Sequence, residues 1–281
     1  MRIDLHTHSN VSDGTQRPEE LIEAAAQAGL DVVALTDHDQ TAGWAPARAT
    51  AQKLGVGFIP GMEITCQDHQ GISVHLLCYL QDPEYLPLLN ELEISRNSRV
   101  IRAQRIVERL AEDYPVSWDL VSAHCQPGAT VGRPHIADAL VTAGVVESRN
   151  DAFANILSSR SRYYVSHPAI DPRDAVRLVL EAGGVPIFAH PMANLRGRVV
   201  PEETFHDMID AGLAGVEIQH RDNSEEGKKF LTSLAKKNDL IITGSSDYHG
   251  AGKLNRLGEN LTEPDMLQRI LDAGSGSQAS L

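Results

Sequence analysis

The chain opens with MRIDLHTHSNVSD at residues 1–13, and this stretch points to both the fold and the site. A short apolar segment, residues 2–6, ends in a His-x-His pair and is followed by the carboxylate of Asp13. Alternate side chains of a β-strand share a face, so we expect His6 and His8 to point the same way at the end of a strand. Two imidazoles and a nearby acid supply half of a metal site.

Six further apolar runs have the length of strands, and amphipathic segments lie between them. Residues 18–28 and 172–182 are expected to be helices, because each has proline in its first turn and glycine directly after its last. This alternation predicts a parallel α/β fold, and specifically a barrel. The additional strands are expected at 32–37, 58–65, 72–80, 185–189, 214–219 and 240–245.

One stretch interrupts the alternation, because residues 83–167 contain no convincing strand. We expect helices there instead, at 91–113, 117–124, 134–143 and 150–158. The sequence therefore predicts a discontinuous barrel, residues 1–82 and 168–273, with a helical insertion. The Gly- and Ser-rich residues 274–281 are expected to form a flexible tail.

The composition limits the possible partners and location. The 281 residues carry 25 basic and 38 acidic side chains, a formal net charge of −13, which disfavours long nucleic acids but not a small anionic substrate near metal ions. The cysteines, Cys66, Cys78 and Cys125, are scattered and suit reduced thiols. No signal-peptide pattern and no apolar run of about 20 residues is evident, so we expect a cytoplasmic protein without membrane contact.

Histidines and carboxylates recur at the predicted strand ends, where parallel α/β folds place functional residues. A single strand-end histidine can be purely structural, and Glu63 alone could be a salt-bridge partner. Burying all of these ionisable groups without metal would cost several kcal/mol for each, so together they predict a metal centre. The additional strand-end residues are Asp37, His38, Asp39, Glu63, His75, His190, Asp247 and His249. Four histidines lie outside this pattern, and we interpret them as surface or core residues. They are His69, His124, His206 and His220.

These motifs resemble those of the polymerase and histidinol phosphatase (PHP) family of metal-dependent phosphoesterases. The resemblance covers residues 1–80 and about 170–260. It rests on DLHTH at 4–8, LTDH at 35–38, AHP at 189–191 and GSSDYH at 244–249. The insertion, with GRPH at 132–135, resembles a subfamily that removes the 3′-phosphate from nucleoside 3′,5′-bisphosphates. Relatives in that subfamily also act as 5′-to-3′ exoribonucleases on short RNA.

The resemblance implies a distorted seven-stranded (βα) barrel that binds two to three divalent metal ions. The implied ligands are His6, His8, Glu63 and Asp247 for the first metal, Asp13, His38 and His249 for the second, and Glu63, His75 and His190 for the third. Asp13 stands where some members have histidine. Mixed imidazole and carboxylate ligation suits Mn²⁺, Fe²⁺ or Zn²⁺ better than Mg²⁺. The catalytic set is expected to comprise Asp13, His38, Glu63, His190, Asp247 and His249.

Four further residues are expected to serve the substrate. Asp37 and Asp39 flank His38 and are interpreted as substrate contacts or as supports of the ligands. Arg133 and His135 begin a predicted helix, where the helix dipole helps to bind a second phosphate. The sequence leaves two roles open for Arg160 and Arg162. They either lie on a solvent-exposed surface or contact the substrate. The arginines of the 91–113 helix are expected to be surface or packing residues, and they are Arg96, Arg99, Arg102, Arg105 and Arg109.

The sequence thus predicts a phosphomonoesterase that converts nucleoside 3′,5′-bisphosphates to 5′-monophosphates. Its alternatives are a 5′-to-3′ exonuclease on short RNA or DNA and a histidinol-phosphate-type phosphatase. An amidohydrolase-type barrel is disfavoured because no lysine falls on a predicted strand to bridge the metals. A non-catalytic metal-binding module is disfavoured because no ligand position is lost. The expected partners are a small nucleotide or short oligoribonucleotides, and the oligomeric state is left open.

Overall fold

The computed structural model describes residues 1–158, 160–166, 168–194 and 197–281. Its sheet has seven strands in chain order, which confirms the predicted barrel strands. The barrel is nearly closed, because Thr7 and Tyr248 form a parallel bridge beyond the first and last strands. The strands are β1 (Ile3–Asp4), β2 (Val32–Leu35), β3 (Gly57–Gln67), β4 (Ser73–Tyr79), β5 (Val185–Phe188), β6 (Gly215–Gln219) and β7 (Ile241–Gly244).

Strand β4 runs against its neighbours, so the expectation of a wholly parallel sheet is wrong at this point. It pairs antiparallel with β3, where His75 lies opposite Thr65, and antiparallel with β5. The connection between β3 and β4 is residues 68–72, far shorter than the dozen or more residues that a parallel crossover needs. The reversal brings the beginning of β4, with His75, to the edge where the parallel strands end.

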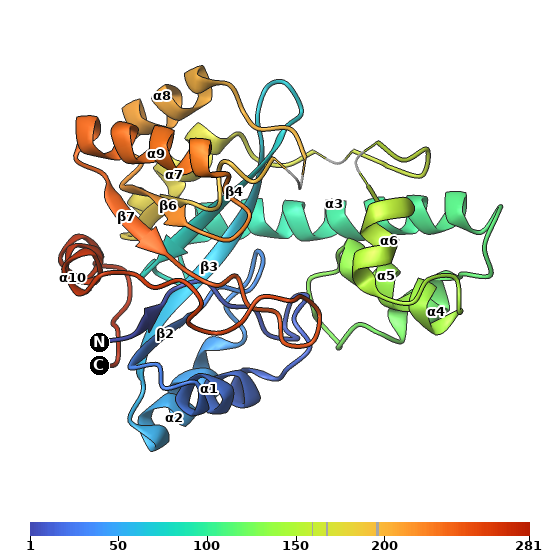
Figure 1. Cartoon of the computed structure of the whole chain (residues 1–281), viewed down its shortest axis with the longest axis horizontal. Coiled ribbons are helices and arrows are strands. Elements are labelled where there is room, and N and C mark those ends of the chain that lie inside the picture. The colour runs from blue at the N-terminus through green and yellow to red at the C-terminus, as the bar shows by residue number, and fades with distance from the viewer. Residues whose placement is uncertain (159, 167, 195–196) are drawn as a thin grey trace.

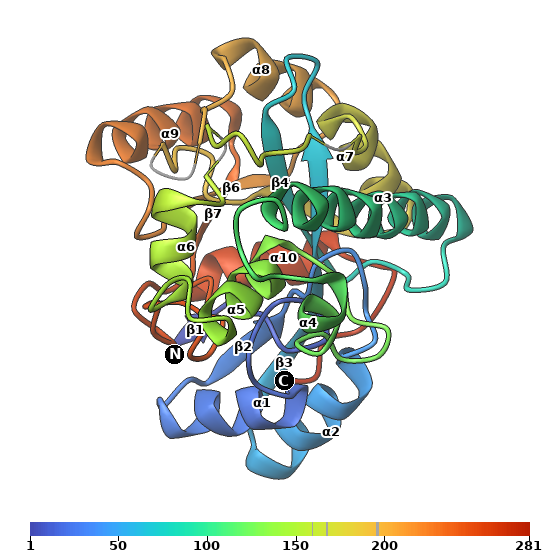
Figure 2. The same ribbon diagram turned by 90° about the vertical axis from the view of Figure 1, so that its right-hand side faces the viewer.

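Helices surround the barrel and close its amino end (Figure 1). Helices α1 and α2 pack beside β2 and β3, whereas α7, α8 and α9 lie beside β4 to β7 (Figures 1 and 2). Helix α10 buries Leu267 and Ile270 against Ile3 and Ile187 inside the barrel, which leaves the carboxyl edge for a site. These helices are α1 (Pro18–Gln27), α2 (Trp44–Leu54), α7 (Pro172–Glu181), α8 (Glu202–Asp210), α9 (Glu225–Asn238) and α10 (Pro264–Ala273).

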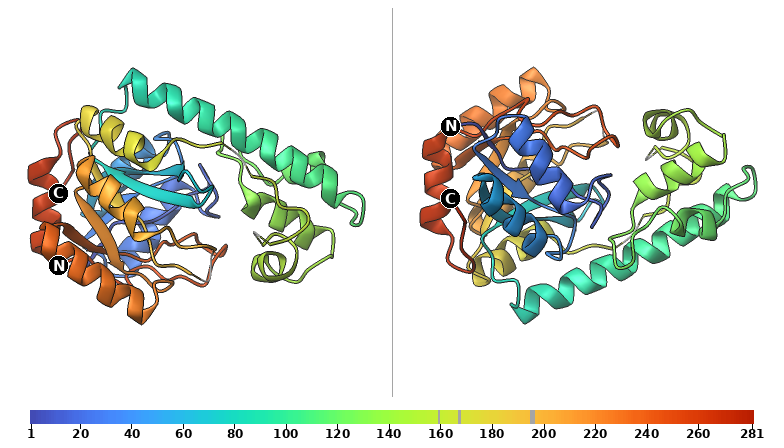
Figure 3. Two further views of the ribbon diagram at one scale, coloured as in Figure 1. Left: turned by 90° about the horizontal axis from the view of Figure 1, so that it is seen from above. Right: turned by 90° about the horizontal axis from the view of Figure 1, so that it is seen from below.

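The insertion is a helical lobe with a core of its own (Figure 3). Its helices are α3 (Leu86–Leu110), α4 (Trp118–Ser122), α5 (Arg133–Thr142) and α6 (Arg149–Asn155). The first half of α3 packs Leu88 and Leu92 into the barrel core, whereas Ile106 and Leu110 in its second half contact the core of α5. Helix α3 therefore belongs to both parts, and it connects them.

The last residues do not form the flexible tail that their composition suggested. In residues 274–281, the backbone N–H of Ser280 donates to the carbonyl of Phe58 (2.9 Å), and that of Phe58 donates back (2.6 Å). A Cβ at Gly276 would lie 2.2 Å from the Ala182 carbonyl oxygen, so glycine here permits close packing. No described helix is long and apolar enough to cross a membrane.

Candidate metal centre

The His-x-His motif lies at the end of β1, inside the barrel mouth. His6 and His8 are fully buried, and their Nε2 atoms lie 3.0 Å apart. From the loop after β7, Asp247 brings Oδ1 to 3.5 Å from Nε2 of His6 and 3.4 Å from Nε2 of His8. Three potential ligand atoms from opposite ends of the chain thus converge.

Glu63 is the centre of this arrangement. Its Oε2 lies 3.4 Å from Nε2 of His6 and 3.2 Å from Nε2 of His8. Its Oε1 lies 2.7 Å from Nδ1 of His75 and 3.2 Å from Nε2 of His190. Each oxygen thus faces its own pair of imidazoles. This arrangement is the one expected of a carboxylate that bridges metal ions.

A third group forms where the loop after β1 meets the loops after β2 and β7. Nε2 of His249 lies 3.2 Å from Oδ1 of Asp13, and Nε2 of His38 lies 3.8 Å from Oδ2 of Asp13. All nine expected ligands therefore meet at one edge of the barrel. Among these residues, four groups of three place their ligand atoms close enough together to bind a single ion. The groups are His6–Glu63–His190, His6–His8–Asp247, His8–His38–Glu63 and His8–Asp13–His249.

Buried imidazole nitrogens test whether metal ions fit here. Nδ1 of His8, Nδ1 of His38 and Nε2 of His249 are buried and form no hydrogen bond of acceptable geometry with the described residues, although carboxylate oxygens lie 3.8, 3.3 and 3.2 Å from them. Buried polar atoms are rarely left unpaired. Imidazole nitrogens and carboxylate oxygens are the donors that Mn²⁺, Fe²⁺ and Zn²⁺ accept, so these residues fit a divalent ion.

The acidic groups shift the protonation of the histidines. Burial alone would lower the pKa of His6, but Glu217, Glu63 and Asp247 outweigh burial and raise that pKa well above its ordinary value. Burial likewise opposes protonation of His8, yet hydrogen bonds with Asp247 and Glu63 raise its pKa to about 9. In the absence of metal, the surrounding carboxylates therefore favour a bound proton on the His6–His8 pair at neutral pH, and one of the two facing Nε2 atoms accepts a hydrogen bond from the other.

We expect Mn²⁺ binding at pH 7 to release protons, because a metal ion needs the neutral imidazoles of His6 and His8. Since His8 is protonated below a pKa of about 9, the affinity should rise as the pH increases from 6 towards 9. Calorimetric titration in two buffers of different ionisation enthalpy measures this release. Equal binding enthalpies in both buffers would contradict it.

Two supporting residues were not predicted as part of the site. Oε1 of Glu217 lies 3.0 Å from Nδ1 of His6, and its Oε2 accepts the backbone N–H of His190 at 2.8 Å. His220, interpreted from the sequence as an unrelated surface or core residue, is fully buried with Nε2 3.6 Å from Oδ2 of Asp247. Such partners orient metal ligands. The rule of strand ends could have found His220, which directly follows β6, but not Glu217, which lies in the middle of that strand.

Lys253 is a further neighbour of the centre that the sequence did not reveal. Its Nζ lies 2.9 Å from Oδ2 of Asp247, on the side of the carboxylate away from His6 and His8. It lies in a loop and belongs to no motif, so no sequence signal identified it.

The backbone is unusual at two of the ligands. His190 and Asp247 have φ angles of 30° and 54°, in the left-handed region that non-glycine residues seldom adopt. Such conformations cost about 1–3 kcal/mol and persist where the surroundings hold them. The fold thus maintains a strained backbone to aim these side chains.

The carboxylates of Asp37 and Asp39 are bonded to other groups of the protein and do not project freely into the site. Asp37 accepts from the backbone N–H and hydroxyl of Ser9 (2.8 and 2.6 Å) and from the hydroxyl of Ser12 (2.7 Å). Asp39 accepts from the Thr65 backbone N–H at 2.8 Å and lies 2.9 Å from Nε of Arg99. Of the two roles expected from the sequence, support of the ligands and substrate contact, we propose the first, in which both residues position the ligand loops.

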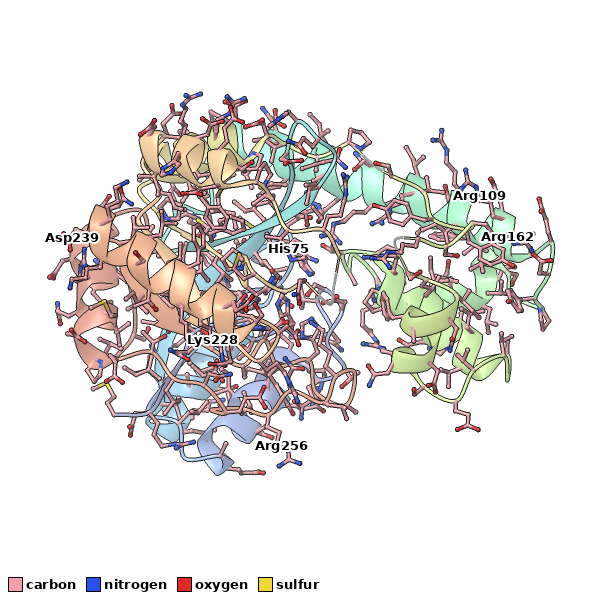
Figure 4. All side chains as sticks on the ribbon, turned by 45° about the horizontal axis from the view of Figure 1, so that its top comes forward. His75, Arg109, Arg162, Lys228, Asp239 and Arg256 are labelled. Carbon is pink, nitrogen blue, oxygen red and sulfur yellow. The ribbon has the colours of Figure 1, made fainter. Side chains whose placement is uncertain are left out.

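The arginines of the insertion divide into two groups. Arg99, Arg102 and Arg133 line one small cavity between α3 and the start of α5. Arg160 is exposed, and Arg162 pairs with Asp113 within the insertion. Figure 4 shows Arg162 at the outer end of the insertion, whereas His75 lies on the barrel. The interpretation of the α3 arginines as surface or packing residues missed this cavity.

His135, expected to contact substrate, lies at the start of α5 and is almost fully buried. Its Nδ1 accepts the backbone N–H of Gly132 at 3.1 Å. Burial lowers the pKa of His135, and the charge of Asp13 opposes that shift. The neutral ring therefore lies within electrostatic reach of Asp13, one of the expected metal ligands.

Comparison with known proteins places this arrangement in a class. Residues 4–168 match the PHP domain. The chain is 32% identical over 255 residues to a 3′,5′-nucleoside bisphosphate phosphatase of Chromobacterium violaceum, with 90% and 89% of the two chains covered. It is 30% identical over 262 residues to a 5′-3′ exoribonuclease of Haemophilus influenzae, with 92% and 94% covered.

A solved structure agrees with these sequence relatives. A candidate metal-dependent phosphoesterase from Bifidobacterium adolescentis superposes with a TM-score of 0.94 at 43% identity, covering 97% of this chain and 96% of that one. The protein is therefore a metal-dependent hydrolase of phosphoester bonds. The chain belongs to the PHP domain family.

Proposed function

We propose that the protein removes the 3′-phosphate from nucleoside 3′,5′-bisphosphates and releases the 5′-monophosphate and phosphate. The observation that carries this proposal is the cavity lined by the partly buried arginines Arg99, Arg102 and Arg133 beside the candidate metal centre. The two features would hold the two phosphates of one small substrate. The relative from Chromobacterium violaceum, a bisphosphate phosphatase by name, supports the same substrate class.

The arginine cavity has the charge of an anion site. Arg102 and Arg133 donate to the backbone carbonyls of Val165 (2.8 Å) and Leu157 (3.1 Å), and no described carboxylate accepts a hydrogen bond from either. Burial, together with the nearby charge of Arg133, lowers the pKa of Arg102 to about 9. Partly buried cations without a counterion carry a desolvation cost, and a phosphate would relieve that cost through charge-assisted hydrogen bonds.

The cavity adjoins the metal centre through Arg99. This arginine contacts Asp39, the residue directly after His38. Burial lowers the pKa of His38 well below its ordinary value, and the charge of Arg99 acts in the same direction. An anion held by the arginines would therefore lie on the side of the candidate metal centre that carries His38 and Asp39.

We propose that the nine ligands bind two to three ions of Mn²⁺, Fe²⁺ or Zn²⁺, divided as the family resemblance implies. Such ions lower the pKa of water to provide a nucleophile near neutral pH and offset charge on the phosphate oxygens. Glu63 and Glu217 hold the imidazoles in place, and Arg133 and His135 hold the second phosphate. These anchors present the 3′-ester to the centre rather than the 5′-ester.

A 5′-to-3′ exoribonuclease is the second candidate, because the relative from Haemophilus influenzae bears that name and aligns over a similar length. It would use the same metal centre on short RNA. We also propose a cytoplasmic location, which suits the three free cysteines.

Initial rates on a substrate panel with Mn²⁺ test the proposal. The panel contains adenosine 3′,5′-bisphosphate, 5′-AMP, histidinol phosphate and a short 5′-phosphorylated oligoribonucleotide. We expect the highest kcat/KM for the bisphosphate. Faster shortening of the oligoribonucleotide would favour the exonuclease.

Replacing Arg133 with methionine should impair bisphosphate hydrolysis selectively. Methionine retains an apolar stem beside the rings of Phe153 and Tyr164 but removes the charge. The loss should be about 1.5–3 kcal/mol, or about 10- to 100-fold in kcat/KM. Hydrolysis of p-nitrophenyl phosphate should change little. Arg162→Met is the matched control, and an equal loss on both substrates would contradict a role in binding the second phosphate.

A further inference from the structure

We infer that the insertion is part of the metal centre, because Thr130 and Arg149 hold the loops that carry Asp13 and His38 and thereby set the affinity of the ion bound there. This inference rests on the proposed ligands. It differs from a role in substrate binding, since both residues contact ligand backbone rather than the arginine cavity.

Thr130 joins the insertion to two barrel loops. Its hydroxyl donates to the carbonyl of His38 at 2.8 Å, and its backbone N–H donates to the carbonyl of Val11 at 3.1 Å. The same hydroxyl accepts from Nε2 of Gln40 at 2.9 Å, so both its donor and its acceptor capacity are used. Thr130 is buried, which removes water as a competing partner. One residue, through its hydroxyl and its backbone N–H, thus connects the His38 loop with the loop that leads to Asp13.

Arg149 makes a second connection from α6. Its Nε and Nη2 pair with the two carboxylate oxygens of Asp138 on α5, at 2.5 Å each. The remaining nitrogen, Nη1, donates to the carbonyl of Asp13 at 3.0 Å. A Cβ at Gly252 would lie 2.2 Å from this nitrogen, so Arg149 also packs on the loop that follows His249. Because two arms of the guanidinium are fixed, the direction of the third is fixed as well.

These contacts act on Asp13, His38 and His249, which the proposed division of the ligands assigns to one metal ion. Thr130 holds the backbone of His38, and Arg149 holds the backbone of Asp13 and packs beside the loop of His249. Hydrogen bonds that support metal ligands are worth about 10- to 100-fold in metal affinity. The barrel still holds the same loop through the bonds of Asp37 to Ser9 and Ser12, so losing one insertion contact should loosen the loop without unfolding it.

Stepwise Mn²⁺ titration of the whole protein, followed by calorimetry and metal analysis, tests the inference. Thr130→Val keeps the shape of the side chain and removes the hydroxyl, whereas Thr130→Ser keeps the hydroxyl. We expect Thr130→Val to weaken one metal equivalent by about 10- to 100-fold and to leave the others within about twofold. Thr130→Ser should bind like the wild type, and kcat of Thr130→Val should recover at saturating Mn²⁺.

Arg149→Met and Asp138→Asn should weaken the same equivalent, and Arg162→Met, within the insertion but away from these loops, should not. Unchanged affinity for every equivalent in Thr130→Val and Arg149→Met would overturn the inference. Uniform weakening of all equivalents with a lower Tm would also overturn it, because the residues would then support the fold. The wild-type titration separates the two proposals, since a wild type that binds no Mn²⁺ would refute the ligand assignment itself.

Discussion

Phosphoester hydrolysis should be lost when metal is removed from the purified protein with a chelator and should return when Mn²⁺ is added. We expect a decrease of about 1,000-fold or more, because without metal the centre lacks both the source of nucleophile and the positive charge on phosphate. The centre cannot compensate, since Glu63, Asp13 and Asp247 add negative charge that would repel a phosphate.

Rates before chelation, after desalting and after Mn²⁺ addition, together with metal analysis of each sample, measure this effect. Circular dichroism of the metal-free sample controls for unfolding. A metal-free sample that stays folded and fully active would contradict metal-dependent catalysis.

Glu63→Gln should have the largest effect of any single substitution. The carboxylate faces imidazoles on both sides, with Oε2 beside His6 and His8 and Oε1 beside His75 and His190. Surrounding imidazoles hold the pKa of Glu63 well below its ordinary value despite burial, so the carboxylate is charged. The substitution therefore removes a negative charge from the centre. Glutamine keeps the size but can offer one neutral oxygen. We expect the rate to fall by about 100- to 1,000-fold or more, with loss of metal.

Glu181→Gln is the matched control, because that carboxylate accepts a hydrogen bond from Tyr85 on the barrel exterior. Metal content by elemental analysis and kcat should be unchanged in the control and reduced in Glu63→Gln. A Glu63→Gln protein with full metal content and near-normal kcat would rule out the bridging role.

The strands and the ligands could be predicted because their signals are local. Each strand is a short apolar run, and four of the ligands lie within a few residues after such a run, so one rule placed His6, His38, His190 and Asp247 at a common edge. The direction of β4 was missed because apolar pattern carries no direction. The five-residue connection at 68–72 held that information.

Other features depend on tertiary contacts that a sequence does not display. The regular spacing of arginines along α3 does not show that Arg96, Arg99 and Arg102 face the barrel and the rest of the insertion rather than solvent. The Gly- and Ser-rich end at 274–281 has the composition of a mobile linker, yet small residues also allow the close packing seen at Gly276. Glu217 was missed because one acid in an apolar strand has several structural explanations.

The most direct test of the proposed function is the identity of the product from adenosine 3′,5′-bisphosphate. Phosphorus NMR of a reaction with Mn²⁺ distinguishes the two monophosphates and follows free phosphate. The arrangement of the arginine cavity beside the metal centre predicts that 5′-AMP and phosphate accumulate together in equal amounts. Accumulation of 3′-AMP would contradict the proposed orientation, because the 5′-ester would then be the one that reaches the metal centre.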